Sequence, residues 1–213
     1  MTKPAIVFVH GLWLSGHEAF LLRRRLVDAH GYDWHSFHYV STFLTMDEIV
    51  AALAAFVAGI DAPTVHLLGH SLGGVAILRY LERNPQFPPG RVVFIGTPAA
   101  PSRAAANLAR FMFGRMILGR AANAELLLAH RREWTSDREL GLIVGTQSLS
   151  FGRLVVHFDE PNDGTVAVSE TALPGATARI LLHESHTGML LSARVAEEVG
   201  SFLESGKFSA SQV

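Results

Sequence analysis

The sequence contains no cysteine, which excludes disulfide bonds, a thiolate nucleophile and cysteine-based metal clusters. Charge is also scarce and balanced: charged residues make up 17% of the 213 residues, with 18 basic against 19 acidic side chains. This balance argues against a disordered chain and against a polybasic arm that binds nucleic acid. Catalysis must therefore use oxygen, imidazole or carboxylate groups, which makes the 11 histidines important.

No apolar run is long enough to span a membrane. The longest extends from Ile49 to Ile60, whereas a transmembrane helix needs roughly 20 residues. The segment from Met1 to His10 lacks the basic start and the small-residue cleavage site of a secretory signal. We therefore expect a cytoplasmic protein without a transmembrane segment, whose 49% apolar residues can fill a core.

Short β-rich runs alternate with helical patterns along the chain. The predicted strands are Ala5–Val9, Trp34–Val40, Thr64–Leu68, Arg91–Ile95, Leu140–Val144, Leu154–Phe158 and Ala178–His183. The predicted helices are Glu18–Asp28, Met46–Ala58, Leu72–Arg83, Arg103–Leu118, Ala122–Trp134 and Leu190–Leu203. Strands separated by helices indicate βαβ units. We predict one α/β domain over residues 1–213, with a mostly parallel central sheet and helices on both faces.

The segment from about Ala99 to Asp137 departs from this alternation, because two helical patterns follow each other without a strand between them. Arginines alternate there with apolar side chains such as Phe111 and Met116. We interpret residues 99–137 as a lid-like or cap-like helical insertion over one end of the sheet. Three roles stay open: a lid or wall of an apolar pocket, a packed surface helix, and peripheral contact with a membrane.

The most informative motif is Gly69-His70-Ser71-Leu72-Gly73, which lies between a predicted buried strand and a predicted helix. A nucleophilic serine needs such a tight, strained strand-to-helix turn, and the flanking glycines let strand and helix approach closely. A packing turn without catalysis is the simpler alternative. A dinucleotide site is disfavoured because Ser71 occupies the place of the second glycine of that fingerprint. A phosphate-binding P-loop would need Gly-Lys-Ser/Thr, which is missing here.

Several segments together resemble the α/β-hydrolase superfamily, in particular small bacterial lipases and esterases. They are Phe8-Val9-His10-Gly11-Leu12, Gly69-His70-Ser71-Leu72-Gly73-Gly74, Ile95-Gly96-Thr97-Pro98, Asn162-Asp163-Gly164-Thr165-Val166 and Ser185-His186-Thr187-Gly188. The resemblance implies an α/β-hydrolase fold and the chain order serine, acid, histidine for a catalytic triad.

The resemblance assigns Ser71 as nucleophile, His186 as base and Asp163 as the acid that orients the base. His183 is the competing base, although its pattern places it on or next to the last strand. Asp159 is the competing acid if Leu154–Phe158 is the sheet strand that ends at the acid. The Asn-Asp-Gly sequence around Asp163 also suits a plain turn.

The resemblance further assigns the backbone N–H groups of Leu12 and Leu72 to an oxyanion hole. We expect a serine esterase or lipase that cleaves carboxylic esters, with a small acyl ester or lipid as substrate, through an acyl-enzyme intermediate. Thioesterase, amidase and acyltransferase activities stay open, as does a non-catalytic homologue that binds a small ligand. No cofactor and no nucleic-acid partner is expected. The histidine pairs His66/His70 and His35/His38 lack the helix and intervening glutamate of a zinc site, so no metal is expected.

Overall fold

The computed structural model describes residues 3–84, 88–111, 113–127, 131–148 and 158–209. Within these residues, six strands form one sheet in the order β2-β1-β3-β4-β5-β6, and every neighbouring pair is parallel. The strands are β1 Ala5–Val9, β2 Asp33–Phe37, β3 Val65–His70, β4 Val92–Ile95, β5 Leu140–Gly145 and β6 Ala178–Leu182. The predicted parallel α/β architecture is confirmed.

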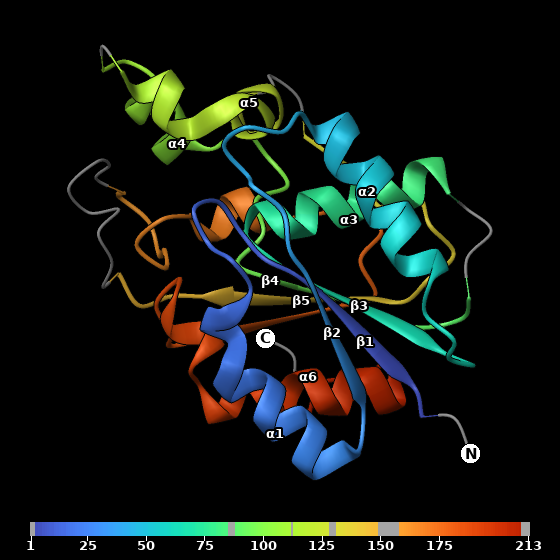
Figure 1. Cartoon of the computed structure of the whole chain (residues 1–213). Coiled ribbons are helices and arrows are strands. Elements are labelled where there is room, and N and C mark those ends of the chain that lie inside the picture. Colours follow the sequence, from blue (N-terminus) through green and yellow to red (C-terminus); the bar gives the residue numbers. More distant parts are fainter. Residues whose placement is uncertain (1–2, 85–87, 112, 128–130, 149–157, 210–213) are drawn as a thin grey trace.

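Helices cover both faces of the sheet. They are α1 Phe20–His30, α2 Met46–Ala58, α3 Leu72–Arg83, α4 Arg103–Leu108, α5 Gly114–Leu126 and α6 Ala193–Ser205. Helices α1 and α6 lie against one face, and α2 and α3 lie against the other (Figure 1). Two buried apolar clusters result, one on each face. Strands β1 and β3 are buried along their whole length because both faces of the sheet are covered.

Local sequence signals explain several of the element boundaries. Helix α2 begins at a capping box, in which Thr45 Oγ1 accepts the Glu48 N–H at 3.3 Å and the Glu48 carboxylate accepts the Thr45 N–H at 2.7 Å. Helix α1 ends at Gly31, which adopts the left-handed conformation with φ 69°. These signals lie within the local sequence, so the predicted helix over Met46–Ala58 matches α2.

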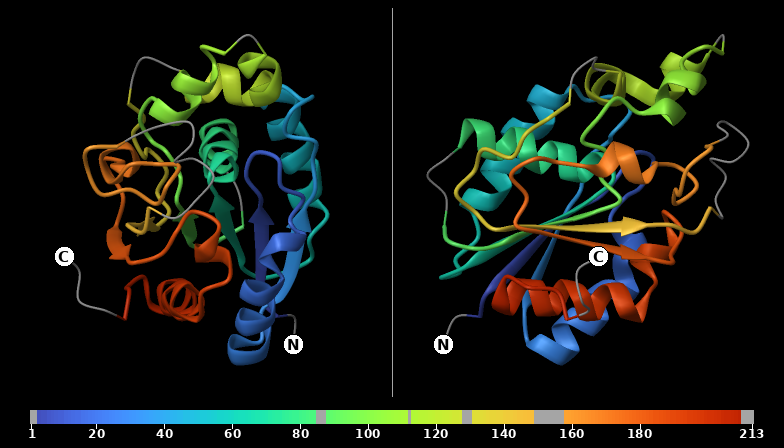
Figure 2. Two further views of the ribbon diagram at one scale, coloured as in Figure 1. Left: turned by 90° about the vertical axis from the view of Figure 1, so that its left-hand side faces the viewer. Right: turned by 180° about the vertical axis from the view of Figure 1, so that it is seen from behind.

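Helices α4 and α5 stand over one end of the molecule (Figure 2), and their bounds differ from the predicted ones: α4 ends at Leu108 instead of Leu118, and α5 begins at Gly114 instead of Ala122. Gly114 allows α5 to begin against α4, since a Cβ at Gly114 would lie 1.6 Å from the Leu108 carbonyl oxygen. The second predicted helix, to Trp134, ends at Leu126 instead. The Trp134 ring packs edge-on against Phe94, with centroids 5.8 Å apart, so burial in the core replaces helical structure there.

Two further sequence predictions concern the chain near these elements. The predicted strand Leu154–Phe158 lies outside the described residues except for Phe158, which is not in a strand. Among the described residues, no helix is long and apolar enough to cross a membrane.

Candidate active site

Ser71 lies in the turn between β3 and α3 with φ 54° and ψ −124°, a left-handed conformation that is strained for a residue with a side chain. Close packing holds this turn. A Cβ at Gly73 would lie 2.0 Å from the Val9 carbonyl oxygen, and one at Gly69 would lie 2.5 Å from the Gly74 Cα. Both glycines are therefore required by contacts between the strands and α3, and they raise Ser71 above the carboxyl end of the sheet.

Asp163 and His186 meet through a hydrogen bond. The distance from His186 Nδ1 to Asp163 Oδ2 is 2.6 Å, and a backbone bond of 2.9 Å joins the His186 N–H to the Asp163 carbonyl. Both residues are buried. Because the partner is a carboxylate, Nδ1 carries the proton and donates it, which leaves the Nε2 lone pair available as a base.

The second oxygen of Asp163 is held by its own loop. Oδ1 accepts the N–H groups of Thr165 at 2.9 Å and Val166 at 2.7 Å, and the Asp163 N–H donates to the Val166 carbonyl at 3.1 Å. The Asn-Asp-Gly segment therefore does form a turn, as the simpler interpretation expected. The same turn orients Oδ2 toward His186, so the two interpretations of this segment are compatible.

Two glycines from other strand ends fit closely around this pair. Gly96 has φ 57°, and a Cβ there would lie 3.1 Å from both Asp163 Oδ2 and His186 Nδ1. A Cβ at Gly145 would lie 2.7 Å from the Asp163 Cβ. The Met189 Cε would be within 3.2 Å of either added carbon. These residues pack closely around the buried Asp163–His186 bond.

His70, the residue before Ser71, connects the turn that contains Ser71 to the loop that contains His186. Its Nε2–H donates to the His186 carbonyl at 3.0 Å, and the two imidazole rings lie 4.8 Å apart. Burial, with a further contribution from His186, lowers the pKa of His70 to about 3. His70 is therefore neutral and places no positive charge beside His186.

The loop after β1 lies against the same turn. A Cβ at Gly11 would lie 2.9 Å from the Ser71 Cβ. His10 is fully buried, its Nδ1–H donates to the Gly11 carbonyl at 2.9 Å, and its own carbonyl accepts the Tyr39 hydroxyl at 2.7 Å. Leu12 follows directly, and Leu72 is the first residue of α3, where helical N–H groups lack intrahelical acceptors.

The competing residues lie elsewhere. His183 is exposed just after β6, and Asp159 is exposed. The pairs His66/His70 and His35/His38 belong to no potential metal site, since the described residues contain no group of three or more histidine, aspartate or glutamate side chains that could hold a metal ion.

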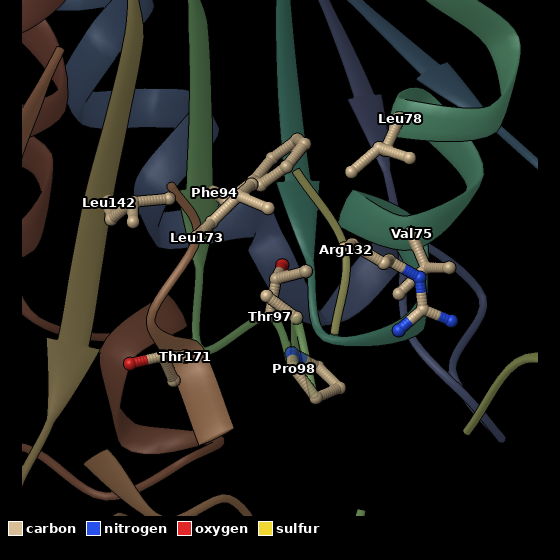
Figure 3. Close-up of a pocket in the computed structure, with 10 residues that line it drawn as sticks. Val75, Leu78, Phe94, Thr97, Pro98, Arg132, Leu142, Thr171 and Leu173 are labelled. Carbon is tan, nitrogen blue, oxygen red and sulfur yellow. The ribbon is translucent and has the colours of Figure 1, made fainter. Parts of the chain in front are cut away.

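Figure 3 shows a narrow pocket beside the site, lined by Val75, Leu78, Phe94, Thr97, Pro98, Ala99, Arg132, Leu142, Thr171 and Leu173. The side chains of Ser71, Asp163 and His186 do not line it. Most of its lining is the apolar core between α3 and the strands, so this pocket is a gap in the packing and not the place where the substrate reacts.

Sequence reasoning did not identify the tight contacts of Gly96 and Gly145 or the neutral state of His70. Gly96 is part of the Gly-Thr-Pro segment that already pointed to the family, so a signal for it was present. Gly145 has no comparable local signal, because its contact with Asp163 arises from tertiary packing.

Comparisons with known proteins show the family and the fold of the chain. A family model described as the alpha/beta hydrolase family matches residues 6–202. The chain belongs to the α/β-hydrolase family. A comparison of this α/β hydrolase with curated proteins gave no match.

Solved structures of several hydrolases share the fold of this α/β hydrolase. The mature lipase BlEst2 from Bacillus licheniformis has a TM-score of 0.71 at 20% identity, over 95% of this chain and 91% of that chain. The type II thioesterase BorB of the borrelidin biosynthetic cluster has a TM-score of 0.63 at 15% identity, over 95% and 92%. The carboxylesterase CesB from Bacillus subtilis has a TM-score of 0.57 at 14% identity, over 97% and 85%. At these identities the likeness concerns the fold.

Proposed function

We propose that this protein is a serine hydrolase that cleaves carboxylic esters through an acyl-enzyme intermediate. The observation that carries the proposal is the buried 2.6 Å hydrogen bond between His186 and Asp163, which His70 joins to the strained Ser71 turn. A serine hydroxyl is a weak nucleophile, and activating it requires a base that a third group orients.

In the acylation step, Ser71 Oγ attacks the ester carbonyl carbon while His186 Nε2 takes the hydroxyl proton. The N–H groups of Leu12 and Leu72 donate to the oxyanion of the tetrahedral intermediate. His186 then gives its proton to the departing alkoxide, and the carbonyl reforms as an acyl ester of Ser71. Asp163 stabilises the imidazolium form and fixes the tautomer.

In the deacylation step, water attacks the acyl carbon and His186 takes one of its protons. The second tetrahedral intermediate collapses, the acid leaves, and His186 returns the proton to Ser71 Oγ. Each proton that the base accepts is thus passed on within the same half-reaction. The chain supplies each of these roles from its own side chains and backbone.

The proposed substrates are esters of apolar acyl groups, because exposed apolar side chains gather on the segment from α4 to α5. They are Phe111, Phe113, Met116 and Ile117, with exposed fractions from 45% to 72%. Exposed apolar side chains of this number on one short segment indicate a surface that meets an apolar ligand. We propose that residues 99–137 form a lid or a wall of the site that binds the acyl group.

The test is covalent labelling with a fluorophosphonate probe, which reacts only with an activated serine. We expect wild-type protein to gain one label and to hydrolyse p-nitrophenyl acyl esters, and Ser71→Ala to lose both. Ser201→Ala is the matched control, because Ser201 lies on α6 and its hydroxyl donates to the Lys207 carbonyl. Absence of labelling and of ester hydrolysis in wild-type protein would contradict the proposal.

The same assay separates the alternatives. A panel of acyl esters, acyl thioesters and anilides of equal chain length compares esterase, thioesterase and amidase activity through kcat/KM. Adding an alcohol acceptor and measuring ester formation tests for acyl transfer. A protein that binds an apolar ester but neither labels nor turns over would instead be a non-catalytic ligand-binding member of the family.

A further inference from the structure

Trp13, the residue after Leu12, has φ 61°, so its backbone is strained like that of Ser71. Trp13 is 58% exposed, and burial therefore does not hold this conformation. Three hydrogen bonds hold it instead. In the first, the Leu14 N–H donates to the Gly11 carbonyl at 3.4 Å and closes the turn over Leu12 and Trp13. The Trp13 backbone N–H donates to Ser41 Oγ at 3.1 Å, and the indole Nε1–H donates to the Ile117 carbonyl of α5 at 2.9 Å.

The segment of α5 that accepts the indole bond is itself fixed to the rest of the protein. Gly119 interrupts the helix with φ 75°, and a Cβ there would lie 2.3 Å from the Thr42 carbonyl oxygen. That carbonyl also accepts the Arg120 N–H at 3.2 Å. The neighbouring Leu118 and Ala121 are buried in the core. The Ile117 carbonyl therefore belongs to a part of α5 that is packed against the rest of the protein.

Three segments thus meet at one joint: the loop after β1, residues 41–42, and residues 117–120 of α5. The loop after β1 is held on its other side by the contact of Gly11 with Ser71 and by the bonds of His10. Leu12 lies between these two attachments. The direction of its N–H is set by the backbone on both sides, because a peptide plane turns as a unit.

We infer that Trp13 is a positioning residue, which directs the Leu12 N–H toward the oxyanion by attaching its loop to α5. The inference rests on the proposed function, since only an acyl-transfer reaction develops an oxyanion there. It makes the 99–137 segment part of the catalytic framework as well as a contact surface for the substrate. A donor aimed at the transition state affects kcat, while ground-state binding of the ester is left unchanged.

The test is Trp13→Phe, which keeps an aromatic ring and removes the indole N–H. We expect kcat for a short p-nitrophenyl ester to fall about tenfold with KM unchanged within about twofold, because a misplaced oxyanion donor weakens transition-state binding alone. The rate constant of fluorophosphonate labelling falls in parallel, since phosphonylation also develops charge on that oxygen.

Trp34→Phe is the matched control. It removes an indole bond of the same kind, from Trp34 Nε1 to Ser36 Oγ at 2.8 Å on edge strand β2, and it should leave kcat unchanged. If Trp13→Phe does not fold, Ser41→Ala removes only the other attachment of Trp13 and should lower kcat with the same unchanged KM.

The outcomes separate the two proposals. Wild-type protein that labels, together with a Trp13→Phe variant that labels and turns over at the same rate, overturns the positioning role alone. Equal losses of kcat in Trp13→Phe and Trp34→Phe, each matched by a lower melting temperature, show a merely structural role and also overturn it. Wild-type protein that neither labels nor turns over refutes the proposed function, and the positioning role falls with it.

Discussion

The two sides of the candidate site are built differently. The acid–base side, with Asp163 and His186, is buried and is held by hydrogen bonds and by glycines that allow close contact. The opposite side, with Trp13 and α5, presents exposed apolar side chains, and a hydrogen bond from Trp13 to the Ile117 carbonyl attaches the loop after β1 to α5. In the proposed mechanism the first side fixes the geometry of proton transfer, whereas the exposed side chains of the second side can be substituted with little loss of stability.

We expect this difference to separate proton transfer, on the buried side, from the preference among acyl chains, which the exposed side chains of α4 and α5 would set. Substitutions on the buried side should reduce kcat steeply for every substrate, because the closely packed surroundings leave the Asp163 and His186 side chains few other positions. Substitutions of exposed side chains on α4 and α5 should instead change the preference among acyl chains.

Asp163→Asn should lower kcat by roughly 10³ to 10⁴-fold, because an amide in place of the carboxylate no longer fixes the Nδ1–H tautomer of His186. Steady-state kinetics with a p-nitrophenyl ester measures the effect. Asp159→Asn is the matched control, since Asp159 is an exposed carboxylate four residues away, and it should keep near wild-type turnover. The reverse pattern would make Asp159 the acid and refute the assignment of Asp163.

Gly96→Ala should lower kcat by about 10 to 100-fold, because the added carbon would press on Asp163 Oδ2 and His186 Nδ1 at 3.1 Å and displace the bond between them. Gly31→Ala is the control for backbone strain: Gly31 has φ 69° but no atom within 4 Å of an added Cβ. It should reduce stability by about 1 kcal/mol without changing kcat. Equal kcat in both variants would argue against close packing as the constraint on this side.

Acid should destabilise the protein through buried histidines outside the proton-transfer pair. Burial, together with Arg91 and Arg138, lowers the pKa of His66 to about 4. Between pH 6.5 and 4 the unfolded chain binds a proton at His66 that the folded protein does not. The free energy of unfolding therefore decreases as the pH is lowered, by up to about 1.4 kcal/mol per pH unit.

Denaturant unfolding at several pH values measures this slope. His66→Gln should make it shallower by close to one proton, while its amide oxygen can still accept the Arg91 N–H that His66 Nδ1 accepts at 3.0 Å. A slope unchanged by the substitution would show that His66 is not the source of the acid sensitivity.

Met116→Ser should have the smallest effect. Met116 is 72% exposed on α5, so its loss should leave the melting temperature unchanged. We expect KM to rise about two to fivefold for long-chain esters and to stay constant for acetate esters, as the loss of roughly one apolar contact implies. Phe20→Ser, 60% exposed on α1, is the control and should change neither value. Equal changes for all chain lengths would contradict a selective role of α5.

The sequence was sufficient to predict the parts of the fold that local signals determine. Strand β1 and helices α2 and α3 have the predicted bounds, because apolar runs, a capping box and the glycine-flanked serine mark them directly. Of the two helices between Ala99 and Asp137, the first was predicted too long and the second was predicted too late in the chain. The start of α5 and the kink inside it depend on Gly114 meeting Leu108 and on Gly119 meeting Thr42, which are contacts that periodicity does not encode.

The same distinction applies to the candidate site. Motifs pointed to Ser71, Asp163 and His186, and the structure brings the last two together at 2.6 Å. Trp13 has a strained backbone, and its hydrogen bond to the Ile117 carbonyl spans 104 positions of the sequence. No local pattern could have indicated that bond. Long-range contacts of this kind require the folded chain.

The most direct test of the proposed mechanism is to detect the acyl-enzyme intermediate on Ser71. Wild-type protein is mixed with a p-nitrophenyl ester, quenched in acid during turnover, digested and analysed by mass spectrometry. We predict a mass increase equal to the acyl group on the peptide that contains Ser71, and none in Ser71→Ala. Turnover without an adduct on Ser71, or with the acyl group on another residue, would contradict the central claim.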